Sequence, residues 1–569
     1  MTDKQQITAE AYLRRLADRG IDYVFANAGT DFAPIIEAIS RNTGGDTKIP
    51  KFITVPHENV AMGMAHGYYR ACGKPAAVMV HVTVGTGNTV NGLMNAARDN
   101  VPLLLAAGRT PLTETGHIGS RNRSIHWGQE AFDQGGMVRE FVKWDYELRG
   151  GQPVEMLVDR ALDIAMSEPR GPVYMTLPRE VLAEPAVSAR RNNTRPLGAT
   201  PTQAARGALE EAAALIAKAE LPLIVTSSGG RTPEAFAELA ALAEEFALPV
   251  VQSEARDVNI PTDHPMHLGF DVSALLPKAD VVLVLEAAVP WIPRAVVPRR
   301  DAKIIHIAAD PLQTRYPFRE FEADLLIAGE ATATLPVLRE ALRAAMKAKG
   351  NGIDSRRKAL VGAREEMEAK RRKLLDSVRD ATPIHPAYVA ACLNELKAEN
   401  AILVNELGLP VGQLHLTKPR SYFGGLLSGG LGFGLGAALG AKIAAPEREV
   451  IAVVGDGSYM FGNPLPFHYV GRAESLATLT IITNNQTWYA VKRATLDVYP
   501  EGRAAKANVM PLTELKPAPD YEKVIETCGG HGEKVEAPAD LMPALKRGLA
   551  AVRAGTPALL NVLTQPGRG

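Results

Sequence analysis

Two polar turns in the last third of the chain carry groups that could bind a cation and a phosphate. A Gly-Asp-Gly-Ser turn follows the apolar run 450–454, and an Asn-Asn-Gln-Thr turn follows the apolar run 476–483. Runs of this length and β-branched content are typical of buried parallel strands, whose carboxyl ends meet at one edge of a sheet. Asp456 and the 485–487 turn would there offer a carboxylate, an amide oxygen and a backbone carbonyl. Mg²⁺ or Ca²⁺ accepts such ligands while keeping room for phosphate oxygens.

The glycines of the first turn support a ligand site, because they let a ligand approach the backbone beside Asp456, Gly457 and Ser458. A second interpretation is purely structural: Asp456 could cap the helix that follows the strand. The first turn taken alone fits both roles.

The elements that must position these turns belong to a large α/β protein. The 569-residue chain is too long for one core and predicts three or more domains. Strand and helix patterns alternate through residues 1–187, 202–345 and 383–569, so we expect an α/β fold with three doubly wound parallel-sheet domains. The polar segment 187–201 is expected to be a linker, and the charged segment 346–381 a solvated helix and connection.

Charge and cysteine content exclude several classes of protein. Lys plus Arg equals Asp plus Glu at 63 each, so no overall field favours nucleic acid or an anionic membrane. The three cysteines include no Cys-x-x-Cys pair, which excludes a disulfide scaffold and a cysteine-rich zinc site and fits the reducing cytoplasm. The N-terminus lacks the apolar core of a signal peptide, and the uncharged run 421–441 is too rich in glycine to be expected to span a membrane.

A glycine-rich run at 429–437 imitates a dinucleotide-binding motif. Gly432, Gly434 and Ala437 match the permissive Gly-x-Gly-x-x-Ala pattern, and Asp456 lies about 20 residues further on. The run is not directly preceded by an apolar strand, which the dinucleotide motif requires. A dinucleotide-dependent oxidoreductase is therefore the alternative, and we expect instead that these glycines let a helix and its preceding loop pack closely against a cofactor ring.

The two turns together resemble the cofactor motif of thiamine diphosphate-dependent enzymes, since Gly-Asp-Gly is followed after 26 residues by Asn-Asn. By this resemblance, Asp456, Asn485 and the Thr487 carbonyl would hold the Mg²⁺ that carries the diphosphate. The carbonyl of Gly429 and the amide of Leu431 would bind the pyrimidine, and the Leu431 side chain would hold the cofactor bent. The three domains would then be a pyrimidine-binding, a middle and a diphosphate-binding domain.

Activation of this cofactor requires a glutamate far away in the chain. Glu58 follows a predicted strand at 51–55 and opens a predicted helix. The resemblance implies that it bonds the pyrimidine and favours its imino form, whereas stabilisation of a helix N-terminus is the structural alternative. Because the pyrimidine and diphosphate sites lie on different domains, usually of different subunits in this family, a homodimer or homotetramer is implied.

The first domain is similar to benzoylformate decarboxylase, within the superfamily of acetolactate synthase and pyruvate decarboxylase. The similar segments include VFANAGTDFAP, HENVAMGMAHGYYRA and HVTVGTGN. By this resemblance, Thr30 would contact the substrate carboxylate. His81 would protonate an enamine or carbonyl oxygen, as imidazole can near neutral pH.

Departures from that pattern bear on the substrate. The segment 286–293 offers no histidine where the subfamily has its second active-site histidine, and Trp291 is expected to line the pocket instead. The segment 126–130 is closer to the Phe-Gln-Glu segment of acetolactate synthases, which makes Gln129 a candidate active-site residue. The sequence lacks the flavin-contacting segment of acetolactate synthases, so FAD is not inferred. It also shows no clear arginine cluster that would bind coenzyme A.

The sequence thus predicts a thiamine diphosphate- and Mg²⁺-dependent decarboxylase or carboligase that acts on a 2-oxo acid through a C2-ylid and an enamine. The enamine would be protonated to an aldehyde or captured by a second carbonyl compound. An acetolactate synthase-like carboligase and a 2-hydroxyacyl-CoA lyase are alternatives, and a dinucleotide-dependent oxidoreductase is a remoter one. A non-catalytic relative is disfavoured because Glu58, Asp456 and Asn485 are present. We expect a cytoplasmic enzyme that binds neither nucleic acid nor membranes.

Overall fold

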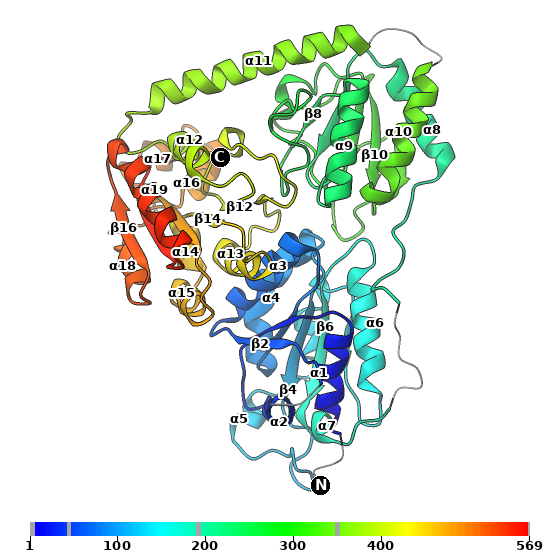
Figure 1. The fold of residues 1–569 in the computed structure, drawn as a ribbon, viewed down its shortest axis with the longest axis vertical. Coiled ribbons are helices and arrows are strands. Elements are labelled where there is room, and N and C mark those ends of the chain that lie inside the picture. Colours follow the sequence, from blue (N-terminus) through cyan, green and yellow to red (C-terminus); the bar gives the residue numbers. More distant parts are fainter. Residues whose placement is uncertain (1–5, 43–46, 189–194, 348–352, 567–569) are drawn as a thin grey trace.

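Three parallel β-sheets follow one another along the chain, which confirms the predicted fold class (Figure 1). The computed structural model describes residues 6–42, 47–188, 195–347 and 353–566. Residues 189–194 of the predicted linker lie outside that part of the chain. The predicted domain limits stay a prediction.

The N-terminal sheet has six parallel strands in the order β2-β1-β3-β4-β6-β5. Its strands are β1 (Tyr23–Ala26), β2 (Lys51–Thr54), β3 (Ala77–Val80), β4 (Leu104–Arg109), β5 (Asp145–Glu147) and β6 (Val173–Pro178). Its helices are α1 (Thr8–Asp18), α2 (Ala33–Arg41), α3 (Glu58–Cys72), α4 (Val82–Arg98), α5 (Ile125–Gly128), α6 (Val154–Met166) and α7 (Arg179–Ala183). Alternate strand residues enter two different cores, Val24 with α1 and α6, and Phe25 with α3, so both faces of the sheet are covered.

The middle sheet has five parallel strands in the order β11-β10-β9-β7-β8. Its elements are β7 (Pro222–Thr226), β8 (Val250–Val251), β9 (Val281–Leu285), β10 (Lys303–Ala308), β11 (Leu325–Ala328), α8 (Arg206–Lys218), α9 (Pro233–Phe246) and α10 (Ala331–Lys347). The helix α11 (Ile353–Val378) then runs from the middle domain to the C-terminal domain (Figure 1). Residues 348–352 of the predicted charged segment lie outside the described residues. From Ile353 to Val378 the segment is a helix, as predicted, but Leu360 is buried and Met367 and Leu374 line a cavity, so this helix is not simply solvated.

The C-terminal sheet has six parallel strands in the order β13-β12-β14-β15-β17-β16. Its strands are β12 (Ile402–Glu406), β13 (Tyr422–Phe423), β14 (Val450–Gly455), β15 (Leu479–Asn484), β16 (His531–Val535) and β17 (Ala558–Leu563). Its helices are α12 (Pro386–Leu396), α13 (Phe433–Ala444), α14 (Asp456–Phe461), α15 (Pro464–Ala473), α16 (Tyr489–Val498), α17 (Arg503–Lys506), α18 (Tyr521–Glu526) and α19 (Pro538–Arg553).

Helices α3 and α13 lie side by side and join the first and third domains (Figure 1). Glycines line their contact: a methyl group added at Gly440 would lie 1.9 Å from the carbonyl oxygen of Met64, and one at Gly436 would lie 2.6 Å from that of Val60. Within the run 429–437, the expectation that the glycines face a cofactor ring is therefore wrong for Gly436, because Gly436 faces the backbone of α3. The contact lets one continuous core extend from the first sheet to the third.

No helix in the described part of the chain is both long and apolar enough to cross a membrane.

Candidate functional site

The two polar turns meet at one edge of the C-terminal sheet. Strands β14 and β15 are adjacent and parallel, with Gly455 opposite Thr483. Asp456 follows the first strand and is the first residue of α14, while Asn485 follows the second strand directly. The predicted meeting of these residues at a shared sheet edge is confirmed.

Asp456 is buried and only partly satisfied. Its Oδ1 atom accepts a hydrogen bond from the N–H of Gly457 at 2.9 Å, as a helix-terminal aspartate would. Its Oδ2 atom is also buried but makes no hydrogen bond within the described residues. Burial raises the pKa of this carboxyl above its usual value, and the nearby amides of Gln486 and Thr487 oppose that shift. The helix-cap interpretation explains Oδ1 and leaves Oδ2 without a partner, which fits a carboxylate that also binds a cation.

The second turn presents its oxygens beside that carboxyl. The amide oxygen of Asn485 accepts the N–H of Thr487 at 3.0 Å, and Gln486 between them has a φ of 56°. The Thr487 carbonyl accepts the N–H of Tyr489 at 2.8 Å and keeps a second lone pair. One carboxylate, one amide oxygen and one carbonyl are a donor set that suits Mg²⁺.

A cavity of about 1330 Å³ opens over this edge of the sheet. We call it the large cavity; the described residues that line it come from the middle domain, α11 and the C-terminal domain. The sequence predicted seven of them as cofactor or metal residues: Gly429, Leu431, Asp456, Gly457, Ser458, Asn485 and Thr487. Trp291 lines it too, as expected, with its ring 5.3 Å from that of Phe321 in an edge-to-face contact.

Glu58 lies in a different place, at the N-terminus of α3. Its side chain is buried, and its two oxygens accept hydrogen bonds from the amide groups of Asn27 at 2.9 Å and Asn88 at 3.1 Å. The N-cap of α3 is His57, whose ring accepts the N–H of Asn59. Because the cap is supplied by His57, the Glu58 carboxyl is not needed to close the helix end.

His81 precedes α4 and makes two side-chain contacts. Its Nδ1 atom is 2.5 Å from Oδ1 of Asp31, and this hydrogen bond raises the pKa of the imidazole despite its partial burial. Its Nε2 atom is 3.2 Å from the Nε2 atom of Gln129, whose Oε1 is buried without a partner in the described structure. A rotated Gln129 amide would place that oxygen on His81 Nε2, which suits a protonated imidazole.

Thr30 completes this group. Its hydroxyl lies 3.4 Å from Nε2 of His126, whose pKa is lowered by burial and by nearby arginines. The structure therefore places Thr30, His81 and Gln129 close together at the carboxyl edge of the first sheet, and their roles toward a substrate stay a prediction. Together with Glu58 they form what we call the N-terminal cluster.

The N-terminal cluster and the large cavity are separate within one chain. The cavity's described lining begins at Ser253, so Glu58, His81, Thr30 and Gln129 lie outside it. In a single chain, the predicted site residues thus form two separate groups, one in the N-terminal cluster and one in the large cavity.

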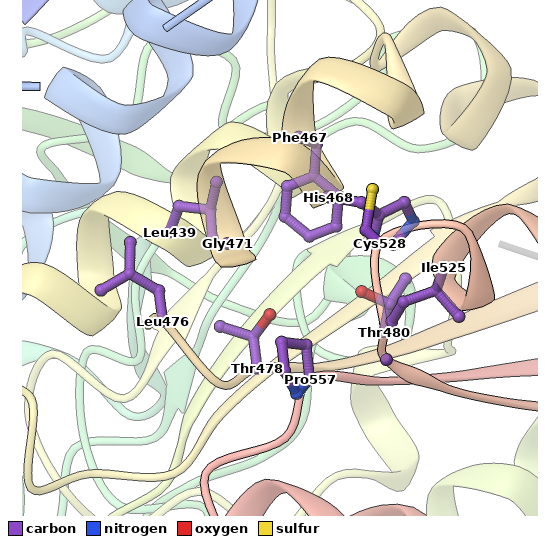
Figure 2. A pocket seen from close by; sticks show the side chains of 11 residues that line it. Leu439, Phe467, His468, Gly471, Leu476, Thr478, Thr480, Ile525, Cys528 and Pro557 are labelled. Atoms are coloured by element: carbon purple, nitrogen blue, oxygen red, sulfur yellow. The ribbon is translucent and has the colours of Figure 1, made fainter. Parts of the chain in front are cut away.

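A second, much smaller cavity lies inside the C-terminal domain (Figure 2). Its volume is about 10 Å³, room for about one water molecule. Thr480 lines it with a buried hydroxyl oxygen that has no partner in the described structure. His468 lines it as well; its ring lies 2.8 Å from the Tyr459 hydroxyl and burial lowers its pKa to about 3, so the imidazole is neutral. This cavity fits one structural water and no substrate.

Sequence models of known families match all three domains. The N-terminal thiamine pyrophosphate-binding domain matches residues 7–137, the central domain of these enzymes matches 209–338, and the C-terminal thiamine pyrophosphate-binding domain matches 409–562. A probable acetolactate synthase of Mycobacterium bovis is 30% identical over 97% of this chain and 95% of its own length.

The chain belongs to the thiamine pyrophosphate enzyme family.

Other members show similarity over the full length. Benzoylformate decarboxylase of Pseudomonas aeruginosa is 27% identical, with 97% of each chain covered. Among solved structures, 4-hydroxybenzoylformate decarboxylase of Rhodococcus jostii superposes with a TM-score of 0.78 at 23% identity, covering 98% of this chain and 99% of its own. Benzoylformate decarboxylase of Polynucleobacter necessarius gives 0.79 at 20% identity, with 99% of each chain covered. These structural matches establish the fold.

Thiamine pyrophosphate is another name for thiamine diphosphate. Family membership therefore makes this protein a thiamine diphosphate-dependent enzyme, a decarboxylase or carboligase. The large cavity fits that cofactor, since it contains a buried carboxylate oxygen that has no partner among the described residues, a group suited to bind a cation that carries phosphate.

Sequence reasoning missed several residues around the N-terminal cluster. Asp31 follows Thr30 directly, and Asn27 lies three residues before Thr30 in the same segment, so both were within the similar stretch. His126 opens the segment that contains Gln129. Asn88 comes from the middle of α4, where only the fold shows that it reaches Glu58.

Proposed function

We propose that this protein is a thiamine diphosphate- and Mg²⁺-dependent enzyme that decarboxylates a 2-oxo acid and releases or transfers the resulting acyl unit. The observation that carries the proposal is the buried Oδ2 atom of Asp456, which has no hydrogen-bond partner among the described residues and lies beside the 485–487 turn in the large cavity. A cation bound there by Asp456, Asn485 and the Thr487 carbonyl would neutralise the carboxylate and hold a diphosphate.

The side chains divide the work between holding the cofactor and handling the substrate. Bound thiamine diphosphate supplies a carbanion at its thiazolium carbon that adds to a keto group. Gly429 and Leu431 would hold the pyrimidine and shape the cofactor, with Gly457 and Ser458 beside the diphosphate. Glu58, held by Asn27 and Asn88, would share a proton with the pyrimidine ring nitrogen and so favour the imino form.

His81 and Thr30 are proposed to act on the substrate. The hydrogen bond to Asp31 favours the protonated imidazole, which can give a proton from Nε2 to a developing carbanion or oxyanion. The Thr30 hydroxyl can bind the substrate carboxylate, and Gln129 can orient the imidazole through Nε2 until a substrate takes its place at that nitrogen. These residues share one sheet edge, so a small 2-oxo acid can reach all of them.

A homodimer or homotetramer is part of the proposal, because one chain does not bring Glu58 to the large cavity. Large apolar side chains are exposed on both sides of the expected contact, with Val84 of α4 52% exposed, and Phe461 and Leu465 of the C-terminal domain 54% and 58% exposed. Burying such side chains against a second copy would remove apolar surface from water.

The test is a panel of 2-oxo acids, including benzoylformate and pyruvate, scored for CO₂ and for aldehyde. The proposal expects release that requires both thiamine diphosphate and Mg²⁺ and that Glu58→Gln lowers at least a hundredfold. CO₂ release that persists in Glu58→Gln, or the absence of release from every acid in the presence of both cofactors, would contradict it.

Carboligation is the second candidate, and the similarity to acetolactate synthases favours it. The same panel run with an added aldehyde or second 2-oxo acid decides between the two, because a carboligase forms coupled product at the expense of free aldehyde.

A further inference from the structure

A buried glutamate that the roles above do not use lies directly beneath the predicted pyrimidine-binding loop. Glu406 ends β12, next to β14, and its side chain is 3% exposed. Its two oxygens accept hydrogen bonds from the N–H groups of Gly432 at 2.7 Å and Gly434 at 2.6 Å. Both donors belong to the first turn of α13, whose N-cap, Gly432, has a φ of 87° and no capping side chain.

The loop that this carboxylate anchors is also held from the opposite side. Asn91 of α4 donates a hydrogen bond to the Leu431 carbonyl at 2.9 Å, and Asn95 donates to the Gly430 carbonyl at 2.7 Å. The loop is therefore fixed between the third sheet and a helix of the first domain. Gly429, with a φ of 64°, and Leu431 are the members of this loop that line the large cavity.

The anchor is stronger than helix capping alone requires. One hydroxyl or amide oxygen usually caps a helix by accepting one N–H, whereas here both carboxylate oxygens are used and both come from a neighbouring strand. Little room is left for movement, since a methyl group at Gly434 would lie 3.1 Å from Glu406 Oε2 and 2.9 Å from Val454. Such an anchor fixes the angle at which Leu431 enters the cavity.

We propose that Glu406 is a positioning residue that holds the Gly429–Leu431 loop in the shape required to bind the pyrimidine half of thiamine diphosphate. This inference rests on the proposed function of the large cavity. It concerns binding of the pyrimidine half, because the diphosphate half is held by Asp456 and the 485–487 turn.

The experiment compares two probes on Glu406→Gln by calorimetry at pH 8, where Glu406 is ionised, namely thiamine diphosphate with Mg²⁺ and inorganic pyrophosphate with Mg²⁺. A glutamine amide can accept only one of the two N–H groups and presents its own NH₂ to the other, so the loop must rearrange. We expect thiamine diphosphate to bind about tenfold more weakly or worse, which corresponds to about 1.4 kcal/mol, while pyrophosphate binding is unchanged.

Equal weakening of both probes, or no weakening of either, would overturn the proposal. Failure of the wild-type protein to bind thiamine diphosphate would instead refute the proposed function, so the two failures are distinguishable. Glu449→Gln is the matched control, because Glu449 accepts the N–H of Ala398 at 2.8 Å just before the opposite end of β14 and should leave both affinities unchanged.

Amide hydrogen exchange separates positioning from general loss of structure. In Glu406→Gln, exchange should accelerate in the peptide that covers residues 428–434 and stay at the wild-type rate in β14 and β15. Acceleration across the whole domain would contradict a positioning role. If Glu406→Gln does not fold, Glu406→Asp, which keeps the charge and shortens the side chain by one methylene, is put through the same two comparisons.

Discussion

Replacement of Gly440 by alanine tests whether the contact between α3 and α13 positions the cofactor loop. The added methyl group would lie 1.9 Å from the Met64 carbonyl oxygen and 2.8 Å from the Tyr68 nitrogen, both in the backbone of α3. Neither atom can turn aside as a side chain could, so the two helices must separate or bend. The loop with Leu431 is continuous with α13 and would move with it.

The magnitude follows from two opposing effects. Overpacking a close contact costs about 1–3 kcal/mol, and a backbone clash of this depth belongs at the upper end. Alanine in place of a helix-interior glycine returns about 1 kcal/mol. The net destabilisation is therefore about 2 kcal/mol, which lowers Tm by about 4–8 °C for a domain of this size.

The assay is thermal unfolding followed by thiamine diphosphate titration, with Gly471→Ala as the control. Gly471 lies in α15 of the same domain, and a methyl group there would meet its nearest atom, of Leu439, at 3.6 Å, an ordinary contact. We expect Gly471→Ala to match or exceed the wild-type Tm and Gly440→Ala to lose both stability and cofactor affinity. A Gly440→Ala protein with wild-type Tm and affinity would refute the reasoning.

Three further predictions concern acidic residues in or next to the proposed sites. Asp31→Asn should lower the pKa of His81, because the substitution removes the carboxylate hydrogen bond that raises this pKa. The limb of the pH–rate profile that depends on protonated His81 should then move to lower pH. A limb that does not move would exclude His81 as the proton donor. Glu58→Gln and Asp456→Ala should each be inactive when expressed alone. Coexpressed at equal levels, the two variants should recover about a quarter of wild-type activity, since half of the dimers would be mixed and each mixed dimer would contain one intact site of two. No recovery would place both residues in a site formed by one chain. Burial raises the pKa of Glu406 from 4.5 to about 7, so its protonation contributes fully to stability below about pH 4.5, and this contribution is lost as pH rises through 7. The free energy of unfolding of Glu406→Gln, measured relative to wild type, should therefore increase by about 3 kcal/mol between pH 5 and pH 8. A difference that does not change with pH would show that Glu406 does not titrate in this range.

The fold was largely predictable because long apolar runs bounded by glycine and polar turns mark buried parallel strands. The runs that became β14 and β15 are examples, with ends within a few residues of those predicted. Short strands such as β13 (Tyr422–Phe423) and β5 (Asp145–Glu147) were missed, since two or three residues carry no periodicity. Pairing with a neighbouring strand, rather than local sequence, defines them.

The candidate site was predictable where the motif itself carries the chemistry and not where tertiary contacts supply it. Asp456 and Asn485 could be placed together because two strand ends share an edge. The pairing of His81 with Asp31, and of Glu406 with the amides of α13, depends on side chains meeting across separate elements. The glycines of α13 were correctly seen as close-contact positions, but their partner is another helix, which the sequence pattern does not specify.

Whether Asp456 binds the cation that holds thiamine diphosphate can be measured by calorimetric titration of the cofactor into the metal-free protein, with and without Mg²⁺, on wild type and on Asp456→Ala. We expect binding that requires Mg²⁺ in wild type and is abolished in Asp456→Ala, because Oδ2 of Asp456, which has no partner in the described structure, would bind the cation. Equally tight, metal-independent binding in both proteins, or uptake of NAD or NADP in place of thiamine diphosphate, would contradict it.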